Sequence, residues 1–484
     1  MTRKGTMTGK KRPRDMRQWL AHLAQTDRLA VLREGVPLKH TLAAMAKLLD
    51  GHKVAYFPRP GGHAMPVVSG FMAQRGWIAE ALGVDSAGLL AAFRTAAESP
   101  LPWREIEGAS APCQEVVLRD VDLLAQLPIP THSEFDSGPY ITAGMVIARN
   151  PVTGVQNVSI NRIQVHARDR MAILMLPRHL HAFYQDAEAR GLELPVAVVI
   201  GADPLTLLAS QAITPIDYDE LEIAGALHGE PLEVVKCLTN DVRVPARAEI
   251  VIEGRLLPGV REEEGPFGEF PRYYSAKEKR EVIAVDAVTH RRGPIFHTIV
   301  PAELEHLLLG AIPREATLLS HLQRSFPGVL DVHLSMGGVG RYHLFVKFRK
   351  RREGEPKNVL LCALGAHYDL KQVIVVDDDV DVHDPKQVEW AVATRFQADR
   401  DLVVIGGAQG SVLDPSTTVG VDDIENLPPA LQGISAKMGL DATRPIAYAG
   451  HVFTKVRIPG EAEIDIAAQI VPNAVVDWET GAVG

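Results

Sequence analysis

The sequence predicts a mixed α/β fold in three parts, in which a β-rich part separates two α/β parts. Three observations predict it: apolar residues at helical spacing near the N-terminus, short strand-like segments from about 115 to 300, and strands that alternate with helices after residue 312. Of the 484 residues, 46% are hydrophobic and 23% are charged, which is ordinary for a globular protein and excludes disordered and fibrous classes. We expect domains at 1–114, 115–312 and 313–484, because the Pro- and Gly-rich stretch 98–114 is typical of a border.

The first part is predicted to contain two helices and one strand. Met16, Trp19, Leu20 and Leu23 stand at i, i+3 and i+4 spacing, which predicts an amphipathic helix over 15–33. A second helical pattern covers 71–82 and follows a strand-like segment at 66–69. This alternation predicts an α/β layer.

The middle part is predicted to be a mostly antiparallel barrel or sandwich. Turn residues separate its strands, and few helices intervene apart from 178–190 and 202–211. The predicted strands are 115–118, 142–148, 155–165, 196–200, 249–252 and 281–288.

The last part returns to alternating strands and helices, which predicts a second α/β layer. The predicted strands are 328–334, 341–348, 373–376 and 401–405, and the helices are 314–323, 355–368 and 385–396.

The net charge and the cysteine content limit the cellular location and the classes of binding partner that we expect. With 51 Lys+Arg and 60 Asp+Glu, the net charge of −9 argues against a nucleic-acid binder. No apolar stretch approaches the ~20 residues of a membrane-spanning helix, and three well-separated cysteines fit a reducing compartment. We therefore expect a cytoplasmic protein without nucleic-acid or membrane partners. One basic cluster is interpreted as a solvated, disordered tail: Arg3, Lys4, Lys10, Lys11, Arg12 and Arg14.

The most unusual segment is the acidic run 262–269. Its Gly-Pro-Phe-Gly bend can hold Glu264 and Glu269 close together, because proline fixes φ and glycine permits positive φ. Two neighbouring carboxylates repel, which raises the pKa of at least one and favours a general acid. The alternative is an acidic loop in water.

A polar strand precedes that segment. In one regular strand Asn157 and Arg162 would be roughly 16 Å apart and on opposite faces, so a bulge, a twist or a ligand wrapping the strand is required. Such a span suits the two ends of a long cofactor, and the alternative is an ordinary edge strand. His179 and Glu220 are further candidates without a short motif of their own.

These segments together resemble the UbiD family of reversible decarboxylases, which use prenylated FMN. The resemblance covers about 16–455 and is most specific in Asn157-Val-Ser-Ile-Asn-Arg162 and Glu264-Gly-Pro-Phe-Gly-Glu269. It continues in Met16-Arg-Gln-Trp-Leu, Pro66-Val-Val-Ser-Gly-Phe-Met-Ala-Gln-Arg, Glu220-Leu-Glu-Ile-Ala-Gly-Ala-Leu-His-Gly, Leu232-Glu-Val-Val-Lys-Cys-Leu-Thr-Asn-Asp and Val392-Ala-Thr-Arg-Phe-Gln-Ala-Asp-Arg-Asp. It implies an N-terminal α/β domain, a central split β-barrel that binds prenylated FMN, and a C-terminal α/β domain that mediates oligomer contacts.

The resemblance also implies the site residues. Asn157, His179 and Glu220 match residues that hold Mn²⁺, or Mg²⁺, against the cofactor phosphate, with K⁺ nearby; such a donor set is compatible with these ions. Arg162, Glu264 and Glu269 match the catalytic trio of the family. Ile160, Arg162, Gln164 and Lys437 complete the expected cofactor-binding set, with Lys437 facing the phosphate.

The implied reaction is non-oxidative loss of CO₂ from an aromatic, heteroaromatic or α,β-unsaturated acid through a covalent adduct with the cofactor. We expect Glu269 to protonate the carbon and Arg162 to orient the carboxylate. The spacing of His306, Arg314 and Arg341 resembles the branch that acts on furan dicarboxylic acid. Otherwise Arg314 caps a helix and Arg341 is a surface strand residue.

Other functions stay open at this stage. A hydroxybenzoate-type decarboxylase, or a carboxylase subunit of a multi-component system, is the alternative within the family. A metal-dependent hydrolase, in which Glu263 or Glu264 with His179 and Glu220 would activate water, is a more distant one. The resemblance further implies a flavin prenyltransferase as cofactor supplier and assembly into a homodimer or homohexamer.

Overall fold

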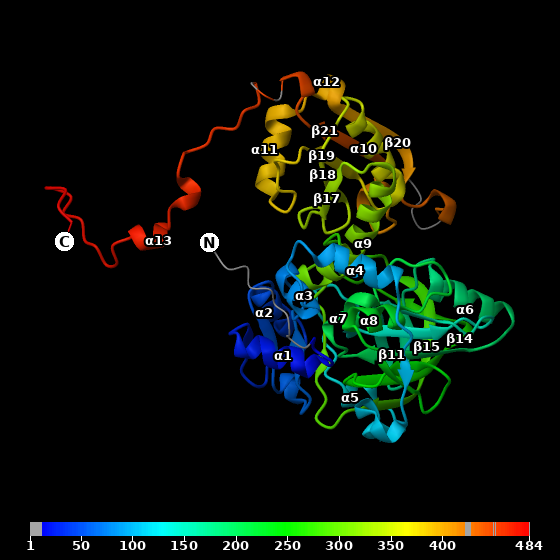
Figure 1. Cartoon of the computed structure of the whole chain (residues 1–484). Coiled ribbons are helices and arrows are strands. Elements are labelled where there is room, and N and C mark those ends of the chain that lie inside the picture. The colour runs from blue at the N-terminus through cyan, green and yellow to red at the C-terminus, as the bar shows by residue number, and fades with distance from the viewer. Residues whose placement is uncertain (1–11, 422–426, 449, 451, 484) are drawn as a thin grey trace. The chain divides into compact units, whose positions relative to one another are not determined.

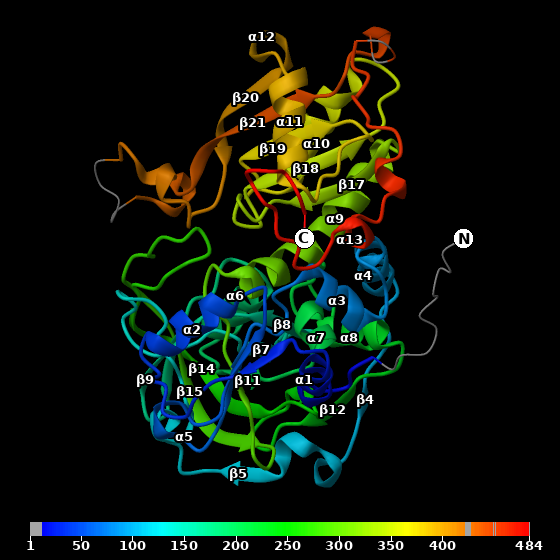
Figure 2. The same cartoon turned by 90° about the vertical axis from the view of Figure 1, so that its left-hand side faces the viewer.

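A nine-stranded antiparallel sheet occupies the middle of the computed structural model, which describes residues 12–421, 427–448, 450 and 452–483 (Figures 1 and 2). The strand order is β6-β9-β10-β15-β14-β11-β7-β8, with β5 paired to β15. The strands are β5 (Val116–Leu118), β6 (Tyr140–Ile141), β7 (Met145–Arg149), β8 (Gln156–Ile160), β9 (Ile163–Ala167), β10 (Arg170–Ile173), β11 (Leu194–Ile200), β14 (Ile250–Glu264) and β15 (Glu278–His290).

One very short connection indicates that the sheet is curved. Only Asn161 and Arg162 separate β8 from β9, although these strands lie near opposite ends of the sheet order. The end strands β6 and β8 share no ladder in the described part of the chain, so the barrel is split rather than closed. The predicted single strand over 155–165 is therefore wrong. The chain leaves β8 at Asn161, whose side-chain amide donates to the Leu174 carbonyl at 3.0 Å. Asn157 therefore lies in β8, whereas Arg162 lies in the two-residue connection to β9.

The hairpin of β14 and β15 carries the acidic segment at its tip. The two strands pair from Ile250 opposite His290 to Glu264 opposite Glu278, with register shifts after Glu253 and after Leu256. Sequence patterning predicted only parts of these strands, 249–252 and 281–288. The outer halves are rich in charge and partly exposed, so they lack the apolar alternation that marks a buried strand.

The N-terminal part packs around the four-stranded sheet β1-β2-β3-β16. The predicted helix 15–33 is too long: α1 ends at Gln25, Asp27 adopts a positive φ of 55°, and Leu29–Val31 forms β1 in parallel with β2. The helix predicted over 71–82 begins only at Arg75, because the amides of Gly70 and Met72 donate to Glu305. The elements are α1 (Met16–Gln25), β1 (Leu29–Val31), α2 (Thr41–Leu49), β2 (Val54–Phe57), β3 (Val67–Ser69), α3 (Arg75–Leu82), α4 (Leu89–Glu98) and β16 (Phe296–His297).

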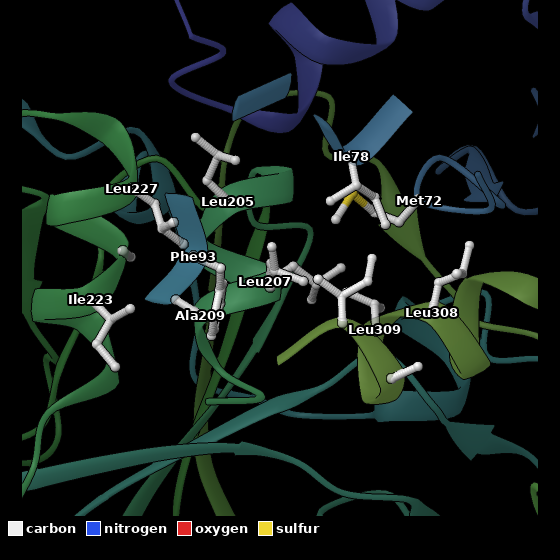
Figure 3. Close-up of a cluster of buried hydrophobic side chains, with 14 of the residues drawn as sticks. Met72, Ile78, Phe93, Leu205, Leu207, Ala209, Ile223, Leu227, Leu308 and Leu309 are labelled. Carbon is white, nitrogen blue, oxygen red and sulfur yellow. The ribbon is translucent and has the colours of Figure 1, made fainter. Parts of the chain in front are cut away.

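Figure 3 shows the apolar cluster that joins the N-terminal helices to the central part. Ile78 from α3 and Phe93 from α4 are buried together with Leu207, Leu227 and Leu308. Complete burial of one such side chain stabilises the fold by about 1.5–3 kcal/mol. The partner helices are α7 (Pro204–Ala209), α8 (Glu220–His228) and α9 (Leu304–Ser325), so the elements that carry Glu220 and Arg314 rest on a rigid base.

The C-terminal five-stranded sheet has the order β17-β18-β19-β21-β20, with helices on both faces (Figure 1). Leu344 and Val373 belong to the same buried cluster as Leu360 of α10, whereas Phe345 and Ile374 cluster with residues of α11. This alternation produces three layers. The elements are β17 (Val329–Leu334), β18 (His343–Phe348), α10 (Glu355–Ala366), β19 (Gln372–Val376), α11 (Pro385–Arg395), β20 (Leu402–Gln409) and β21 (Ile434–Ala442); the last was not predicted.

The remaining elements are short apart from one helix. They are β4 (Arg104–Glu105), α5 (Leu123–Gln126), α6 (His179–Ala189), β12 (Glu233–Lys236), β13 (Arg243–Pro245), α12 (Ala398–Asp401) and α13 (Ile466–Gln469). Of the basic cluster, Arg3, Lys4, Lys10 and Lys11 lie outside the described residues. For Arg12 and Arg14 the predicted solvated tail is wrong. Arg12 donates to the carbonyls of Leu82 and Leu227, and Arg14 pairs with Glu230.

The mixed α/β architecture predicted from the sequence is confirmed. Residues 12–350 and 354–443, as far as they are described, form one compact unit, and 351–353 with 444–483 form a second. The division at 114/115 and 312/313 stays a prediction, and α9 runs across the second of these borders. Among the described residues, no helix has the length and apolar character needed to cross a bilayer.

Candidate active site

Glu264 and Glu269 occupy the two ends of the bend at the tip of the β14–β15 hairpin. Glu264 is the last residue of β14 and is fully buried. Gly265 has a φ of +85°, and a Cβ there would lie 2.5 Å from the Ala276 carbonyl oxygen, so only glycine fits. Glu269 keeps 12% of its side chain exposed. The bend therefore buries one carboxylate and leaves the other partly open.

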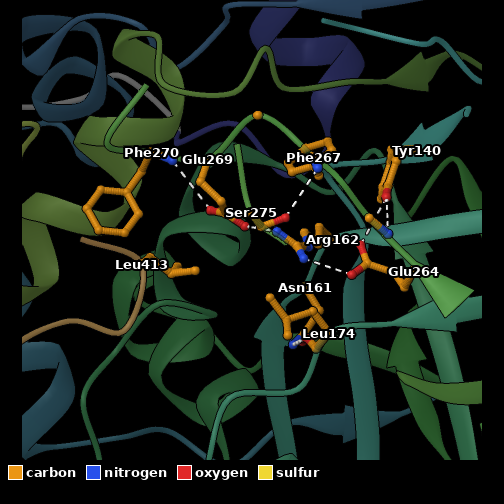
Figure 4. A network of polar contacts seen from close by, with 12 residues as sticks. Tyr140, Asn161, Arg162, Leu174, Glu264, Phe267, Glu269, Phe270, Ser275 and Leu413 are labelled. Atoms are coloured by element: carbon orange, nitrogen blue, oxygen red, sulfur yellow. Dashed lines mark hydrogen bonds and ion pairs between the residues drawn. The ribbon is translucent and has the colours of Figure 1, made fainter. Parts of the chain in front are cut away.

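Arg162 lies between these two carboxylates (Figure 4). Its Nη2 is 2.7 Å from Oε2 of Glu264, and its Nη1 is paired with Oε1 of Glu269. Burial disfavours the charged guanidinium, but the charges of Glu269 and Glu264 outweigh burial and raise the pKa of Arg162. The guanidinium also lies 5.3 Å from the ring centroid of Phe267. A cation thus separates the two acids, which the sequence had suggested would repel one another directly.

Polar side chains behind the bend hold it in place, and of these Gln164 and Tyr140 are buried. The Gln164 oxygen accepts from the Gly265 amide at 3.2 Å and lies 3.1 Å from the Tyr140 hydroxyl. Asp136 accepts from the Gly268 amide at 2.9 Å, and Ser275 contacts the Phe267 amide at 3.2 Å. Gln164, predicted from the resemblance as a cofactor-binding residue, here binds the backbone of the acidic bend.

A cavity opens beside Glu269 and Arg162. The residues that line it are mixed and include apolar Ile160 and Phe270 and polar His306 and Arg341. Apolar walls combined with a few polar groups are typical of small-molecule sites. Glu264 does not line this cavity, so the two acids differ in their access to a substrate.

A second cavity adjoins the first. Asn157, His179 and Glu220 line it, together with Arg314. Six lining residues are common to both cavities: Ile160, Asn161, Leu176, Gln211, Gly310 and Arg341. The predicted metal-ligand set and the predicted acid–base set therefore border one continuous cleft.

Asn157, His179 and Glu220 line the same cavity, and the chemistry of their side chains suits a divalent cation. The Glu220 carboxylate accepts from the Asn157 amide at 3.0 Å and from the Val158 backbone N–H at 2.7 Å, but no ion pair joins it to a described cationic side chain. Burial raises the pKa of Glu220 to about 8, while burial and the charge of Arg178 lower the pKa of His179. A cation bound there would supply the compensating positive charge that the protein does not provide for this buried carboxylate.

The donors in this set are an amide, an imidazole and a carboxylate. Within the described residues no cluster of three or more His, Cys, Asp or Glu is placed to hold a metal, so the amide of Asn157 would have to serve as a ligand. An amide oxygen, an imidazole nitrogen and a carboxylate suit Mn²⁺ or Mg²⁺ better than a soft metal.

The three residues predicted to bind substrate lie in or beside this cleft. Arg314 is buried in the middle of α9, where its Nη1 donates to the Gly310 carbonyl at 2.7 Å, so it is not a helix cap. Burial, and after it the charge of Arg341, lowers the pKa of Arg314 to about 9, which leaves it cationic at pH 7. Arg341 lies 4.2 Å from the Phe270 ring centroid and lines both cavities, so it is not a surface strand residue. His306 accepts from the Ala302 amide, and burial lowers its pKa to about 3, which keeps it neutral.

Two other residues of the predicted cofactor-binding set, Ile160 and Lys437, differ in whether they line the cleft. Ile160 lines both cavities, as expected of a residue that contacts a bound group. Lys437 lies on β21, where its Nζ donates to the Tyr368 carbonyl at 2.9 Å beyond the end of α10, and it is not among the lining residues of the cleft. Its contact with a phosphate stays a prediction.

Sequence reasoning missed several residues of the site. Arg178 and His367 line the larger cavity, and Tyr140 contacts Glu264. Only Arg178 carried a signal, since it directly precedes His179. His367 and Tyr140 occupy unremarkable sequence contexts, and only the tertiary fold brings them to the cleft.

An acid–arginine–acid chain at the wall of a cleft is typical of an acid–base enzyme. Family models for the 3-octaprenyl-4-hydroxybenzoate carboxy-lyase match its N-terminal domain at 20–96, its Rift-related domain at 104–304 and its C-terminal domain at 307–442. The chain belongs to the UbiD family and is a carboxy-lyase.

Characterised relatives act on different acids. The chain is 41% identical to an anhydromevalonate phosphate decarboxylase of Methanothermobacter thermautotrophicus, over 80% of this chain and 87% of that protein. It is 32% identical to a gallate decarboxylase of Lactiplantibacillus plantarum, over 78% and 81%.

Solved structures of the family match nearly the whole chain. The UbiD-class enzyme HmfF from Pelotomaculum thermopropionicum, in complex with FMN, is 48% identical with a TM-score of 0.90, over 94% of this chain and all of that one. An evolved dimeric form of HmfF holds prenylated FMN and is 45% identical with a TM-score of 0.87, over 95% and 100%. The resemblance inferred from the sequence motifs is confirmed.

Proposed function

We propose that this protein uses prenylated FMN to decarboxylate, reversibly, an aromatic, heteroaromatic or α,β-unsaturated acid, and that a furan dicarboxylate is its substrate. The observation that carries the proposal is Arg162 held between Glu264 and Glu269 at the wall of a cavity. The flavins bound in two HmfF structures support the choice of cofactor.

Loss of CO₂ from an sp² carbon leaves an electron pair that no protein side chain can accept, and prenylated FMN would supply that electron sink. Arg162 lines the cavity, and its guanidinium would orient the carboxylate of the substrate. Glu269, which lines the cavity, would give its proton to the carbon that loses CO₂. The carboxylate so formed is paired with Arg162, which stabilises it. A positioned general acid contributes roughly 10²–10⁴-fold in rate.

Glu264 has a different role in this proposal. It is fully buried and lines neither cavity, so it would not exchange a proton with substrate. Its ion pair fixes the guanidinium of Arg162, which in turn orients the departing carboxylate.

The opposite end of the cleft would hold the cofactor phosphate. Asn157, His179 and Glu220 would bind Mn²⁺ or Mg²⁺ against it, with K⁺ and Lys437 contributing further positive charge. Ile160 and Gln164 complete the proposed cofactor-binding set. The buried carboxylate of Glu220 without a cationic partner supports this assignment.

The choice of a dicarboxylate rests on cations that face no carboxylate. Arg341 lines both cavities, Arg314 lines the larger one, and neither forms an ion pair with a described acid. A second carboxylate on the substrate would provide that partner, and the planar guanidinium suits it.

A hydroxybenzoate-type substrate is the second candidate. It is supported by the likeness to a 3,4-dihydroxybenzoic acid decarboxylase from Enterobacter cloacae, which is 30% identical with a TM-score of 0.85 over 94% of this chain and 98% of that one. The hydrolase alternative is disfavoured, because Glu264 is bound by Arg162 and Tyr140 and does not line the cavity of His179 and Glu220.

We test the proposal with protein produced beside a flavin prenyltransferase, the cofactor supplier that it implies. The released cofactor should have the mass and absorption spectrum of prenylated FMN, and CO₂ release should be greatest with furan-2,5-dicarboxylate. Protein that binds no flavin under these conditions contradicts the proposal. Preferential turnover of 3,4-dihydroxybenzoate or gallate supports the second candidate instead.

The proposal extends to assembly and location. We expect a homodimer or homohexamer, in line with the dimeric form of HmfF. The free thiols of Cys113, Cys237 and Cys362 support a cytoplasmic location.

A further inference from the structure

We propose that the hydroxyl of Tyr140 is a positioning group for the reaction, because it holds Glu264 against Arg162 and so sets the pH range in which the acid–base chain works. This inference rests on the proposed function for its kinetic part only. Tyr140 lies on β6, is fully buried, and is not among the described residues that line the two cavities, so it acts through Glu264 and not on the substrate.

The contacts of the hydroxyl determine which way its proton points. The Tyr140 oxygen lies 3.0 Å from Oε1 of Glu264 and 3.1 Å from the side-chain oxygen of Gln164, and both of these atoms are acceptors. The Gly265 amide donates to the same hydroxyl at 3.1 Å, and Ser137 lies 3.0 Å away. A phenol has one proton, and an ionised carboxylate is a stronger acceptor than an amide. The proton therefore goes to Glu264.

Figure 4 shows the result as a continuous chain from Tyr140 through Glu264 and Arg162 to Glu269. Each oxygen of Glu264 has its own donor: Oε1 accepts from the phenol and Oε2 from Arg162. The Tyr140 ring packs at 4.4 Å on the ring of Phe267, which Arg162 also contacts. The hydroxyl thus contacts the carboxylate of Glu264 directly, and the ring packs on the aromatic side chain that contacts the guanidinium of Arg162.

The remaining charged groups near Glu264 do not replace this donor. Glu278 stands opposite Glu264 in the β14–β15 ladder, but its carboxylate is paired with Arg280. Asp136 binds the Gly268 amide on the far side of the bend. Arg162 is the one cation paired with Glu264 among the described residues, and it is shared with Glu269.

The phenol stays a donor throughout the working pH range. Burial, and after it the charge of Glu264, raises the pKa of Tyr140 above its ordinary value of 10. Removal of a donor from an ionised carboxylate favours its protonated form. Without the hydroxyl, Glu264 should therefore take up a proton at a higher pH and release its hold on Arg162.

The direct test compares Tyr140→Phe with wild type by infrared spectroscopy of the flavin-free protein, which requires no turnover. The carbonyl band of protonated Glu264, assigned by its loss in Glu264→Gln, should appear at a pH about one unit higher in the variant, a tenfold change in the protonation equilibrium. The Gly265 amide keeps its bond to Gln164 in this variant, which limits the damage to the bend. An unchanged midpoint overturns the proposal.

The kinetic test uses the cofactor-loaded enzyme. In Tyr140→Phe, kcat should fall about tenfold, KM should stay within about twofold, and the acidic limb of the pH profile should move upward by about one unit. If the infrared shift is found in a protein that decarboxylates no acid, the proposed function fails while the role of Tyr140 in holding Glu264 stands.

Tyr184→Phe is the matched control. Tyr184 is also buried and lines neither cavity, and its hydroxyl also donates to a carboxylate, but to that of Glu188 at 2.6 Å and not to Glu264. This variant should keep the wild-type midpoint and pH profile, and an equal shift in both variants would show a general effect of lost hydroxyls and overturn the proposal.

A second substitution keeps the test decisive if Tyr140→Phe does not fold. Fluorotyrosine placed at position 140 is nearly the same size but is a stronger donor, so it should move the Glu264 midpoint and the acidic limb to lower pH. A midpoint that does not move overturns the proposal.

Discussion

The two ends of the cleft differ in how their buried charges are compensated. At the acidic bend, Arg162 is paired with both Glu264 and Glu269, so each of these carboxylates has a cationic partner within the protein. At the other end, Glu220 is buried without a cation, while Arg314 and Arg341 have no carboxylate partner in the described residues. Since an unpaired buried charge is costly, the first region is preorganised for chemistry and the second is completed by what binds there.

The largest expected effect concerns the preorganised end. Glu269→Gln keeps the shape of the side chain but removes its proton-donating function, so turnover should fall by at least about 100-fold. Binding of the flavin should be largely retained, because the proposed phosphate and metal contacts lie at the other end of the cleft. Single-turnover kinetics with a flavin titration checks both. Activity near that of wild type would remove Glu269 from the mechanism.

The next effect concerns the end completed by ligands. Glu220→Gln removes the charge that a divalent cation would neutralise, so Mn²⁺ should no longer stabilise the protein. Saturating Mn²⁺, at about 100 times its Kd, should stabilise the wild type by about 2.7 kcal/mol. Thermal unfolding with and without Mn²⁺ measures the difference. An equal response of both proteins would show that the ion binds elsewhere.

A smaller, selective effect is expected from Arg341→Ala. It should raise KM for a dicarboxylate by roughly tenfold, about 1.4 kcal/mol, and should change KM for the corresponding monocarboxylate much less. Steady-state kinetics with furan-2,5-dicarboxylate and furan-2-carboxylate provides the comparison. Equal changes for the two substrates would exclude a role in recognising the second carboxylate.

The smallest effect is expected from Glu263, which lies next to the preorganised site but is not part of it. Glu263 belongs to the same acidic run as Glu264, but it is exposed and pairs with Lys277 at 2.6 Å. Glu263→Gln should leave both the stability and kcat essentially unchanged, because solvent screens an exposed ion pair. A large loss of activity, measured beside Glu269→Gln, would show that the charge of the whole run matters and not the pairing with Arg162.

The three-part α/β architecture could be predicted from the sequence, because its periodicity is strong and local. What failed depends on tertiary contacts. Apolar spacing continues past Gln25, but the turn at Asp27 and the pairing of β1 with β2 end the helix. The break at Asn161 and Arg162 has no Gly or Pro to mark it, and β21 is interrupted by Lys437, Gly439 and Asp441.

The candidate site shows the same limit. Arg162, Glu264 and Glu269 could be selected because their motifs are specific, and the fold brings them into contact. Tyr140 could not be selected, since its contact with Glu264 spans 124 positions and leaves no local pattern. The bonds of Lys437 to carbonyls at the end of α10 were likewise beyond the reach of sequence motifs.

The most direct test of the central proposal is the fate of the proton during a single turnover of furan-2,5-dicarboxylate in D₂O, followed by NMR. Cofactor-loaded wild type should give furan-2-carboxylate with one deuterium at the carbon that lost CO₂, and Glu269→Gln should give at least about 100-fold less of it in the same time. Equal rates of deuterated product from both proteins, or no product from the loaded wild type with any acid tested, would contradict the role assigned to the Arg162–Glu269 pair.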